Sequence, residues 1–122
     1  MDDNNTARFK SKRFAVRIVN LYKYLHDEKN EHVMSKQILR SGTSIGANLA
    51  ESETAFSRKD FASKIYIALK ETCETLYWLE ILHETGYLTD EQFDNITADG
   101  MELRKMLSVT TRTLQNQVKN QQ

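Results

Sequence analysis

The chain has 122 residues, 17 basic and 17 acidic side chains, and a hydrophobic fraction of 39%. This length fits one domain with one core, and no apolar run reaches the roughly 18–20 residues that a membrane span needs. The polar start, residues 1–5, does not resemble a secretory signal, and the single cysteine, Cys73, excludes an intramolecular disulfide framework and suits a reducing cytoplasm. Because the chain has no proline and only four glycines, it favours long helices over sheets.

The first predicted helix begins at about Ser11, with an earlier start near Thr6 as the alternative, and ends between Tyr24 and Asp27. The polar stretch 27–32 is expected to form the first connection. Apolar side chains recur at helical spacing and draw one stripe along this helix: Phe14, Ile18, Leu21, Tyr22 and Leu25.

The second predicted helix runs from about Met34 to about Thr54. Gly42 and Gly46 lie inside it, and each costs about 1 kcal/mol relative to alanine in a helix interior. We therefore expect a packing reason for both glycines: a slender helix that another backbone can approach closely.

The third predicted helix begins at Ser57, which forms an imperfect capping box with Asp60, and ends at Gly86 in a left-handed conformation, with Tyr87 covering the last turn. Its stripe comprises Phe61, Ile65, Ala68, Thr72, Leu76, Leu79 and His83, widened by Leu69 and Leu82.

The fourth predicted helix begins at Thr89, where Gln92 completes a capping box and Leu88 packs on Phe93 as a hydrophobic staple. Its amide-rich end, residues 115–122, is expected to fray. The stripe comprises Phe93, Ile96, Gly100, Leu103, Leu107, Leu114 and Val118.

Four amphipathic helices joined by short connections predict an all-α, antiparallel up-and-down four-helix bundle. We expect a single domain over residues 1–122, with its core at about 11–114 and polar, frayed termini.

The charges are unevenly distributed along the chain. Residues 4–26 contain no acid, residues 71–103 contain no lysine or arginine, and residues 104–122 again contain no acid. An up-and-down bundle would therefore have one basic and one acidic end, although helix-end preferences alone could bias surface charges in this way. A basic end is a candidate site for RNA, DNA or an acidic protein surface. The cations expected to contribute are Arg8, Lys10, Lys12, Arg13, Arg17, Arg104, Lys105 and Arg112.

Catalytic and metal sites find little support in the sequence. A di-iron bundle needs two Glu-x-x-His pairs, and Glu80 with His83 forms the only one. His26 and His32 lack further ligands at zinc spacing, and Cys73 has no catalytic partner. We therefore expect no enzymatic activity, cofactor, metal or small-molecule substrate, and a metal-dependent oxidase is the least favoured of three hypotheses.

A polar line on the second helix suggests a network or an interface. Arg40 and Glu51 lie about 16 Å apart along the helix, too far to pair with each other, so each needs a partner on another helix or another subunit, or else faces solvent. The aromatic pair Tyr77 and Trp78 completes the core or contributes to an oligomer interface. The line itself comprises Arg40, Ser44, Asn48 and Glu51.

The segment 40–51, RSGTSIGANLAE, resembles the signature of bacterial four-helix-bundle proteins first noticed as products of intervening sequences in large-subunit rRNA genes. Stretches 60–61, 68–71, 74–75 and 77–79 match one branch of that family, and the resemblance covers roughly residues 11–110. It implies a cytoplasmic bacterial protein that assembles into a ring-like homopentamer, and no enzymatic activity.

The resemblance also gives weight to three polar residues, Arg40, Asn48 and Glu51, as structural or interface positions. A related group comprises the accessory proteins of diversity-generating retroelements, basic pentamers that bind nucleic acid and a reverse transcriptase. The present chain differs from that group in carrying no net charge. The leading hypothesis is a non-enzymatic, homo-oligomeric interaction protein, and the alternative is a nucleic-acid-binding accessory factor that acts through the basic end.

Overall fold

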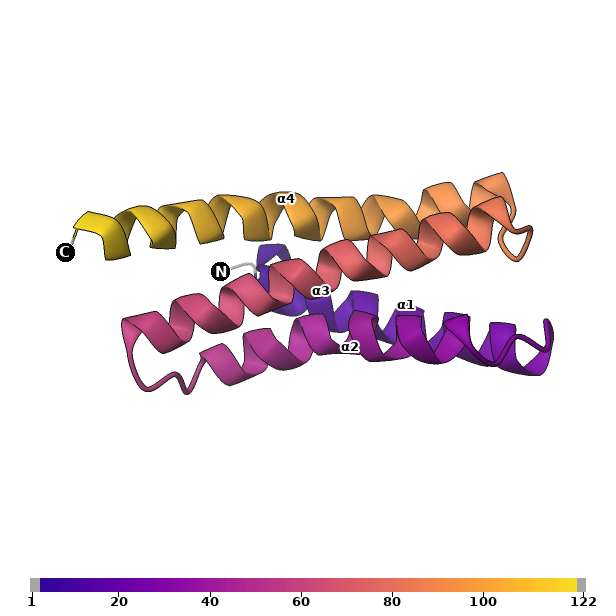
Figure 1. Cartoon of the computed structure of the whole chain (residues 1–122), viewed down its shortest axis with the longest axis horizontal. Helices are drawn as coiled ribbons and strands as arrows, with labels where there is room; N and C mark the ends of the chain where they lie inside the picture. The colour runs from indigo at the N-terminus through magenta and orange to yellow at the C-terminus, as the bar shows by residue number, and fades with distance from the viewer. Residues whose placement is uncertain (1–2, 121–122) are drawn as a thin grey trace.

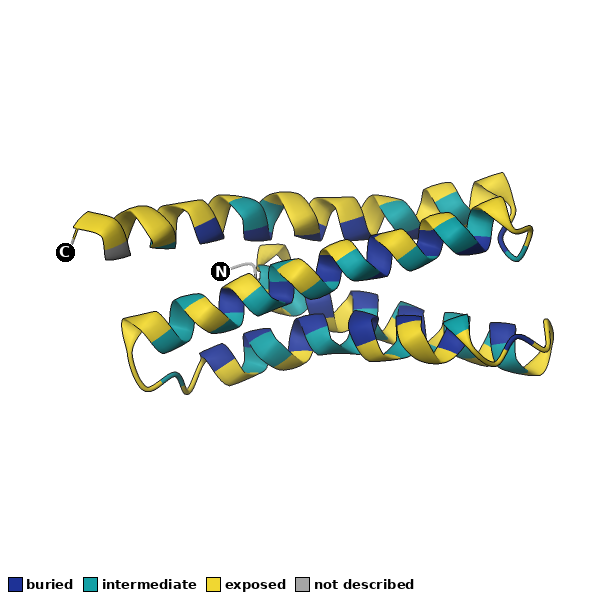
Figure 2. Ribbon diagram, viewed as in Figure 1, coloured by how far each residue is buried: buried dark blue, intermediate teal, exposed yellow. Residues whose placement is uncertain are grey.

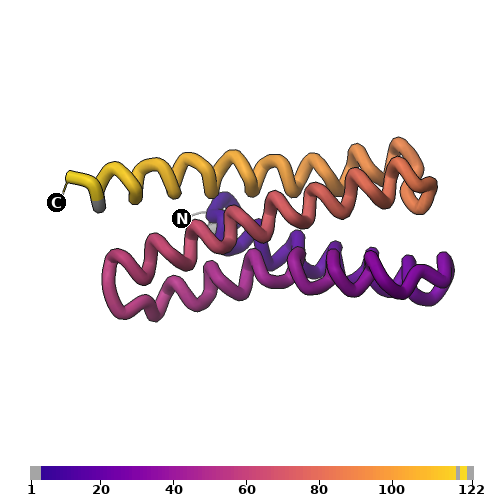
Figure 3. Tube along the Cα trace, in the orientation of Figure 1, coloured from indigo at the N-terminus to yellow at the C-terminus, as the bar shows by residue number. Residues whose placement is uncertain are grey.

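The computed structural model describes residues 3–120, which form a short 3-10 turn, η1 (Asp3–Asn5), and the helices α1 (Ala7–Asp27), α2 (Met34–Ser52), α3 (Arg58–Glu84) and α4 (Asp90–Asn120). The α1–α2 and α3–α4 connections lie at one end of the molecule, and the α2–α3 connection lies at the other (Figure 1). The Cα trace follows the same up-and-down path (Figure 3). The predicted all-α four-helix bundle is therefore confirmed.

Short polar side chains fix the starts of two helices. The Phe9 amide donates to Thr6 Oγ1 at 3.0 Å, so α1 takes the earlier of its two expected starts. At α3 the Asp60 amide donates to Ser57 Oγ at 3.0 Å, as predicted. The Asp60 carboxylate accepts from the amide of Phe56 rather than from that of Ser57, so the return bond of the box reaches one residue further back.

The connection between α3 and α4 uses both devices that the sequence predicts. Gly86 has a φ of +87°, and Tyr87 N donates to Leu82 O at 2.9 Å, which closes a Schellman motif at the end of α3. Thr89 Oγ1 accepts from the Gln92 amide at 3.1 Å, and Gln92 Oε1 accepts from the Thr89 amide at 2.9 Å. This reciprocal pair is the predicted capping box of α4.

Two helix ends differ from the sequence-based bounds. The second helix ends at Ser52 rather than Thr54, because the amides of Glu53 and Thr54 turn back to carbonyls three residues earlier. The fourth helix continues to Asn120, whereas residues 121–122 lie outside the described part of the chain.

The start of α2 depends on a residue that the sequence places only in a polar connection. The Glu31 carboxylate accepts hydrogen bonds from the amides of Val33 at 2.8 Å, Met34 at 2.6 Å and Ser35 at 3.1 Å. Ser35 Oγ returns a bond to the Glu31 carbonyl at 2.8 Å. Glu31 is consequently buried despite its charge, since the free amides of the first helical turn replace water around it.

Buried residues occur along all four helices, on the sides of the helices that face one another (Figure 2). The glycines of α2 have the expected packing reason: a β-carbon on Gly42 would lie 2.7 Å from Ile18 Cγ2, and one on Gly46 would lie 3.2 Å from Ser11 Oγ. A β-carbon on Gly100 of α4 would likewise lie 2.8 Å from Leu76 Cδ2 of α3. Over residues 3–120, no helix combines the length and the apolar character that a membrane crossing requires.

Candidate functional site

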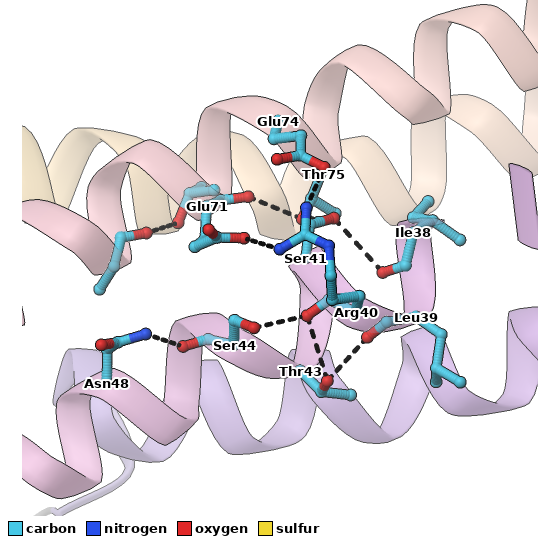
Figure 4. A network of polar contacts seen from close by, with 12 residues as sticks. Ile38, Leu39, Arg40, Ser41, Thr43, Ser44, Asn48, Glu71, Glu74 and Thr75 are labelled. Carbon is cyan, nitrogen blue, oxygen red and sulfur yellow. Dashed lines mark hydrogen bonds and ion pairs between the residues drawn. The ribbon is translucent and has the colours of Figure 1, made fainter. Parts of the chain in front are cut away.

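A charged cluster joins α2 to α3 at the middle of the bundle (Figure 4). The Arg40 guanidinium lies 3.1 Å from Glu71 Oε2 and also binds Glu74 Oε2. Trp78 Nε1 donates to the same Glu74 oxygen at 3.0 Å. The cluster therefore ties one arginine of α2 to three side chains on one side of α3.

The cluster changes the ionisation of its members. Hydrogen bonds from Trp78 and then Arg40 lower the pKa of Glu74, against a smaller opposing effect of burial. The hydrogen bond to Glu74 is likewise the main cause of the raised pKa of Arg40. Both shifts favour the charged forms, so the pair stays ionised at neutral pH.

A buried hydrogen bond lies directly behind this cluster. The hydroxyl oxygens of Ser41 and Thr75 are 2.8 Å apart, and neither residue has any measurable exposure. Thr75 also bonds to the Glu71 carbonyl at 2.8 Å. Two kinds of interaction thus join α2 to α3: the ion pairs of Arg40 near the surface and the hydrogen bond of Ser41 in the core.

The predicted polar line of α2 finds its partners within the same chain. Ser44 Oγ donates to the Arg40 carbonyl at 2.6 Å, and Asn48 Nδ2 donates to the Ser44 carbonyl at 2.8 Å. Glu51 Oε1 lies 4.0 Å from Lys64 Nζ of α3. The two charged ends of the line therefore reach α3, whereas the two short side chains bond to their own helix. The sequence left open whether the partners belong to this chain or to another copy, and it did not identify Glu71, Glu74 or Lys64.

The aromatic pair divides between two environments. Trp78 is half-buried and uses its N–H within the cluster, whereas the Tyr77 side chain is 53% exposed. Their ring centroids lie 5.5 Å apart, edge to face. Tyr66, about three turns earlier on α3, is also exposed, at 47%. The two tyrosine side chains of α3 therefore face outward, whereas Trp78 belongs to the cluster that joins α3 to α2.

The outward side of α2 carries no charge over ten consecutive residues, 41–50. Five of these residues are partly or fully exposed although none of them is large: Thr43, Ser44, Ala47, Asn48 and Ala50. A solvated helix face normally carries charged side chains, so this stretch has the composition of a contact surface.

Three of the eight cations expected to bind nucleic acid are engaged in ion pairs. Arg8 lies 3.1 Å from Glu53, Lys10 lies 2.7 Å from Glu102, and Arg17 lies 2.7 Å from Asp99. The other five are exposed, and none has an ion pair among the described residues: Lys12, Arg13, Arg104, Lys105 and Arg112.

The helix directions place the charges as the sequence predicts. The basic end, named here for the end that holds the α2–α3 connection, receives the last part of α4, where residues 104–120 contain four basic and no acidic side chains. The acidic end, which holds the other two connections, receives residues 80–94 with five acids and no lysine or arginine. The bundle is thus electrically polarised along its length.

The described residues offer little that resembles an active site. Within 3–120 no three His, Cys, Asp or Glu side chains are grouped so that they could hold a metal ion. His83 instead contacts Asp90 at 2.6 Å and stacks on Phe93 at 4.3 Å between ring centroids. An open groove of about 460 Å³ between α1 and α4 has an apolar floor that includes Leu21 and Ile96.

Most of the chain is similar to a known family and to a solved structure. A family model described as 23S rRNA-intervening sequence protein matches residues 3–109. The chain is similar to a protein of unknown function from the S23 ribosomal protein family of Bacteroides thetaiotaomicron, solved by crystallography at 1.70 Å resolution. The two share 57% sequence identity over 87% of this chain and 98% of that one, with a TM-score of 0.85. No match was found among curated proteins.

Proposed function

This chain belongs to the family of 23S rRNA-intervening sequence proteins, and from that premise we propose that it is a non-enzymatic homo-oligomeric interaction protein of the bacterial cytoplasm. The observation that carries the proposal is the uncharged outward side of α2 over residues 41–50. Small side chains there allow a second helix to approach closely. Burial of this surface against a protein would remove apolar area from water without leaving a charge unpaired.

The intramolecular cluster supports this reading of α2. Arg40 holds α2 against Glu71 and Glu74 of α3, and Ser41 bonds to Thr75 beneath it. A helix fixed in this way presents a rigid surface, so association would require little further ordering of the chain. Arg40, Ser44, Asn48 and Glu51 then act as structural residues at the edge of the interface. Five copies is the number that the family resemblance implies.

Light scattering coupled to size-exclusion chromatography tests self-association. The Ala47→Glu variant adds a charge at the centre of the uncharged side of α2, and we expect it to release monomers at concentrations where the unchanged protein stays assembled. Gln117→Glu adds the same charge at an exposed position near the end of α4 and serves as the matched control. Elution of the unchanged protein as a monomer of 14.2 kDa would refute the proposal.

A second candidate function, nucleic-acid binding at the basic end, is favoured by the five unpaired cations. Arg104, Lys105 and Arg112 lie on a part of α4 without acids, so no neighbouring carboxylate on that segment competes with a phosphate. Side chains of this kind bind phosphates mainly through charge, and their affinity falls steeply as salt rises.

Fluorescence anisotropy of a labelled single-stranded RNA and a labelled DNA duplex, each at two salt concentrations, tests this second function. A variant with Arg104, Lys105 and Arg112 all changed to Gln should lose affinity and show a shallower salt dependence. Lys29→Gln, at the acidic end, is the control. Equal binding by the triple variant and the unchanged protein would exclude the basic end as the binding site.

A further inference from the structure

Two outer faces of the bundle carry apolar side chains without a partner. The first, named the α1–α2 face, lies on the sides of α1 and α2 that point away from the other two helices. Lys10 and Arg17 mark the opposite side of α1, because they pair with α4, and Arg40 marks the opposite side of α2, because it pairs with α3. The face comprises Val16, Val19, Leu39, Thr43, Ala47 and Ala50, all partly or fully exposed.

The second, named the α3–α4 face, lies on the other side of the molecule. Glu71 and Glu74 point from α3 toward α2, and Asp99 and Glu102 point from α4 toward α1, so the side chains that avoid both directions gather between α3 and α4. Three of them are large and exposed, with Met101 at 43%. The face comprises Tyr66, Cys73, Tyr77, Ala98 and Met101.

The two faces lie at the same level of the bundle. Three contacts define one cross-section through all four helices: Ile18 against Gly42, Ser41 bonded to Thr75, and Leu76 against Gly100. The residues that directly follow Ile18, Gly42, Leu76 and Gly100 are partly or fully exposed and lie in the same cross-section. Val19 and Thr43 thereby belong to the α1–α2 face, and Tyr77 and Met101 belong to the α3–α4 face.

Unpaired charges flank the two faces at matching heights. Lys23 and Lys36 extend the α1–α2 face, whereas Glu80 and Asp94 extend the α3–α4 face. At about 1.5 Å per residue, all four lie about 6–9 Å from the shared cross-section, toward the acidic end. Each is exposed, and none has an ion pair within the described residues. The two lysines on one side of the molecule and the two carboxylates on the other thus lie at similar positions along the bundle axis.

We propose that the α1–α2 face of one copy receives the α3–α4 face of the next copy, with the bundles parallel and side by side; this inference rests on the self-association proposed above. The tyrosine rings and Met101 pack into the shallow surface made by Thr43, Ala47 and Ala50. Lys23 and Lys36 of one copy meet Glu80 and Asp94 of its neighbour.

The geometry of this contact determines the kind of assembly. Because two different faces meet, the interface is heterologous and every copy keeps one free face until the assembly closes on itself. Because the faces share one level, neighbouring copies have no offset along the bundle axis. A rotation without a rise is compatible with the closed ring that the family resemblance implies, and it collects the basic ends of all copies on one rim.

Cysteine cross-linking tests the contact, since Cys73 of the α3–α4 face is exposed and is the only cysteine. Val16→Cys places a second thiol on the α1–α2 face, at an exposed position near the same level. We expect a short bismaleimide to convert this variant into a covalent ladder from dimers up to the full assembly. The unchanged protein and the double variant Val16→Cys, Cys73→Ser each hold one thiol and should give no ladder.

Asn20→Cys is the matched control, because Asn20 is exposed on the side of α1 toward α4. Three results would overturn the inferred contact. A ladder from the Asn20→Cys variant would place the neighbour on another face. Dimers from the unchanged protein would indicate that two α3–α4 faces meet. An assembled Val16→Cys variant that gives no ladder would reject the contact while leaving self-association intact, whereas a monomeric unchanged protein would reject both.

Charge reversal provides an independent test that needs no thiol. We expect the double variant Lys23→Glu, Lys36→Glu to lose the assembly at a protein concentration where the unchanged chain keeps it. Adding Glu80→Lys and Asp94→Lys to that chain should restore the assembly, because the reversed charges again oppose each other across the interface. If the fourfold variant remains as dissociated as the double variant, these charges do not face each other and the contact is refuted.

Discussion

Trp78 Nε1 donates a hydrogen bond to Glu74 Oε2 at 3.0 Å, one turn earlier on α3, and the same oxygen binds the guanidinium of Arg40 from α2. The only tryptophan of the chain is therefore in direct contact with the ion pair that joins two helices. Its fluorescence reports on the α2–α3 junction, which carries the uncharged surface proposed as part of the interface.

The first prediction concerns acid pH. Because the folded state lowers the pKa of Glu74 below its ordinary value of 4.5, Glu74 stabilises the fold fully above that value and loses its effect as pH falls through the lower, folded pKa. We expect the thermal midpoint, followed by Trp78 fluorescence at fixed protein concentration, to fall from pH 5 to pH 3. Glu74→Gln should lower the midpoint at pH 7 and flatten this decline.

Glu84→Gln is the control for that titration, since Glu84 is exposed at the end of α3 and has no ion pair among residues 3–120. An equally steep decline in Glu74→Gln and in the unchanged protein would show that other carboxylates govern the acid sensitivity.

The second prediction concerns close packing of α1 on α2. A methyl group at Gly42 would lie 2.7 Å from Ile18 Cγ2 and 3.1 Å from Ile18 Cβ, so the rigid, buried isoleucine cannot turn away from it. Gly42→Ala should destabilise the fold by about 1–3 kcal/mol even though alanine is the better helix former. Chemical denaturation followed by circular dichroism measures this difference.

Gly100→Ala provides the comparison, because its nearest neighbour is Leu76 Cδ2, the mobile tip of a longer side chain. We expect a smaller loss of stability there, since leucine can change rotamer to make room. Stabilisation by Gly42→Ala would mean that helix propensity outweighs the close approach and that α1 and α2 pack less tightly than described.

The third prediction concerns the start of α2. The Glu31 carboxylate accepts from three amides, so Glu31→Gln leaves one oxygen and turns an NH₂ group toward N–H donors. The loss should be about 1–2 kcal/mol, in the range of a removed helix cap. The exposed neighbour Glu28 supplies the control variant Glu28→Gln, which should change the denaturation midpoint very little. Equal effects of the two variants would assign the stabilisation to net charge rather than to capping.

Local features of the fold could be predicted from the sequence because their physical causes are local. Ser57, Gly86 and the Thr89–Gln92 pair act within a few residues of the chain, and the structure confirms each of them. Glu31 escaped prediction because its carboxylate reaches forward over four residues from a segment that otherwise reads as a solvated connection.

The partners of Arg40 could not be predicted, since they depend on how far α2 and α3 are rotated about their axes. Periodicity shows that Arg40 lies beside the apolar line of α2, but it does not show which neighbouring helix lies on that side of the line. The bond between Ser41 and Thr75 sets the rotation, and Arg40 then faces Glu71 and Glu74. The level shared by Val19 and Tyr77 likewise emerges only from contacts between helices.

Native mass spectrometry of the unchanged chain at low micromolar concentration tests the central claim, assembly of identical copies into a closed ring through two different faces. We expect one dominant species of about 71 kDa, five times the 14.2 kDa of one chain, without a series of larger species, because a heterologous contact without rise closes on itself. A spectrum dominated by the 14.2 kDa monomer, or by a dimer that does not grow with concentration, would contradict it.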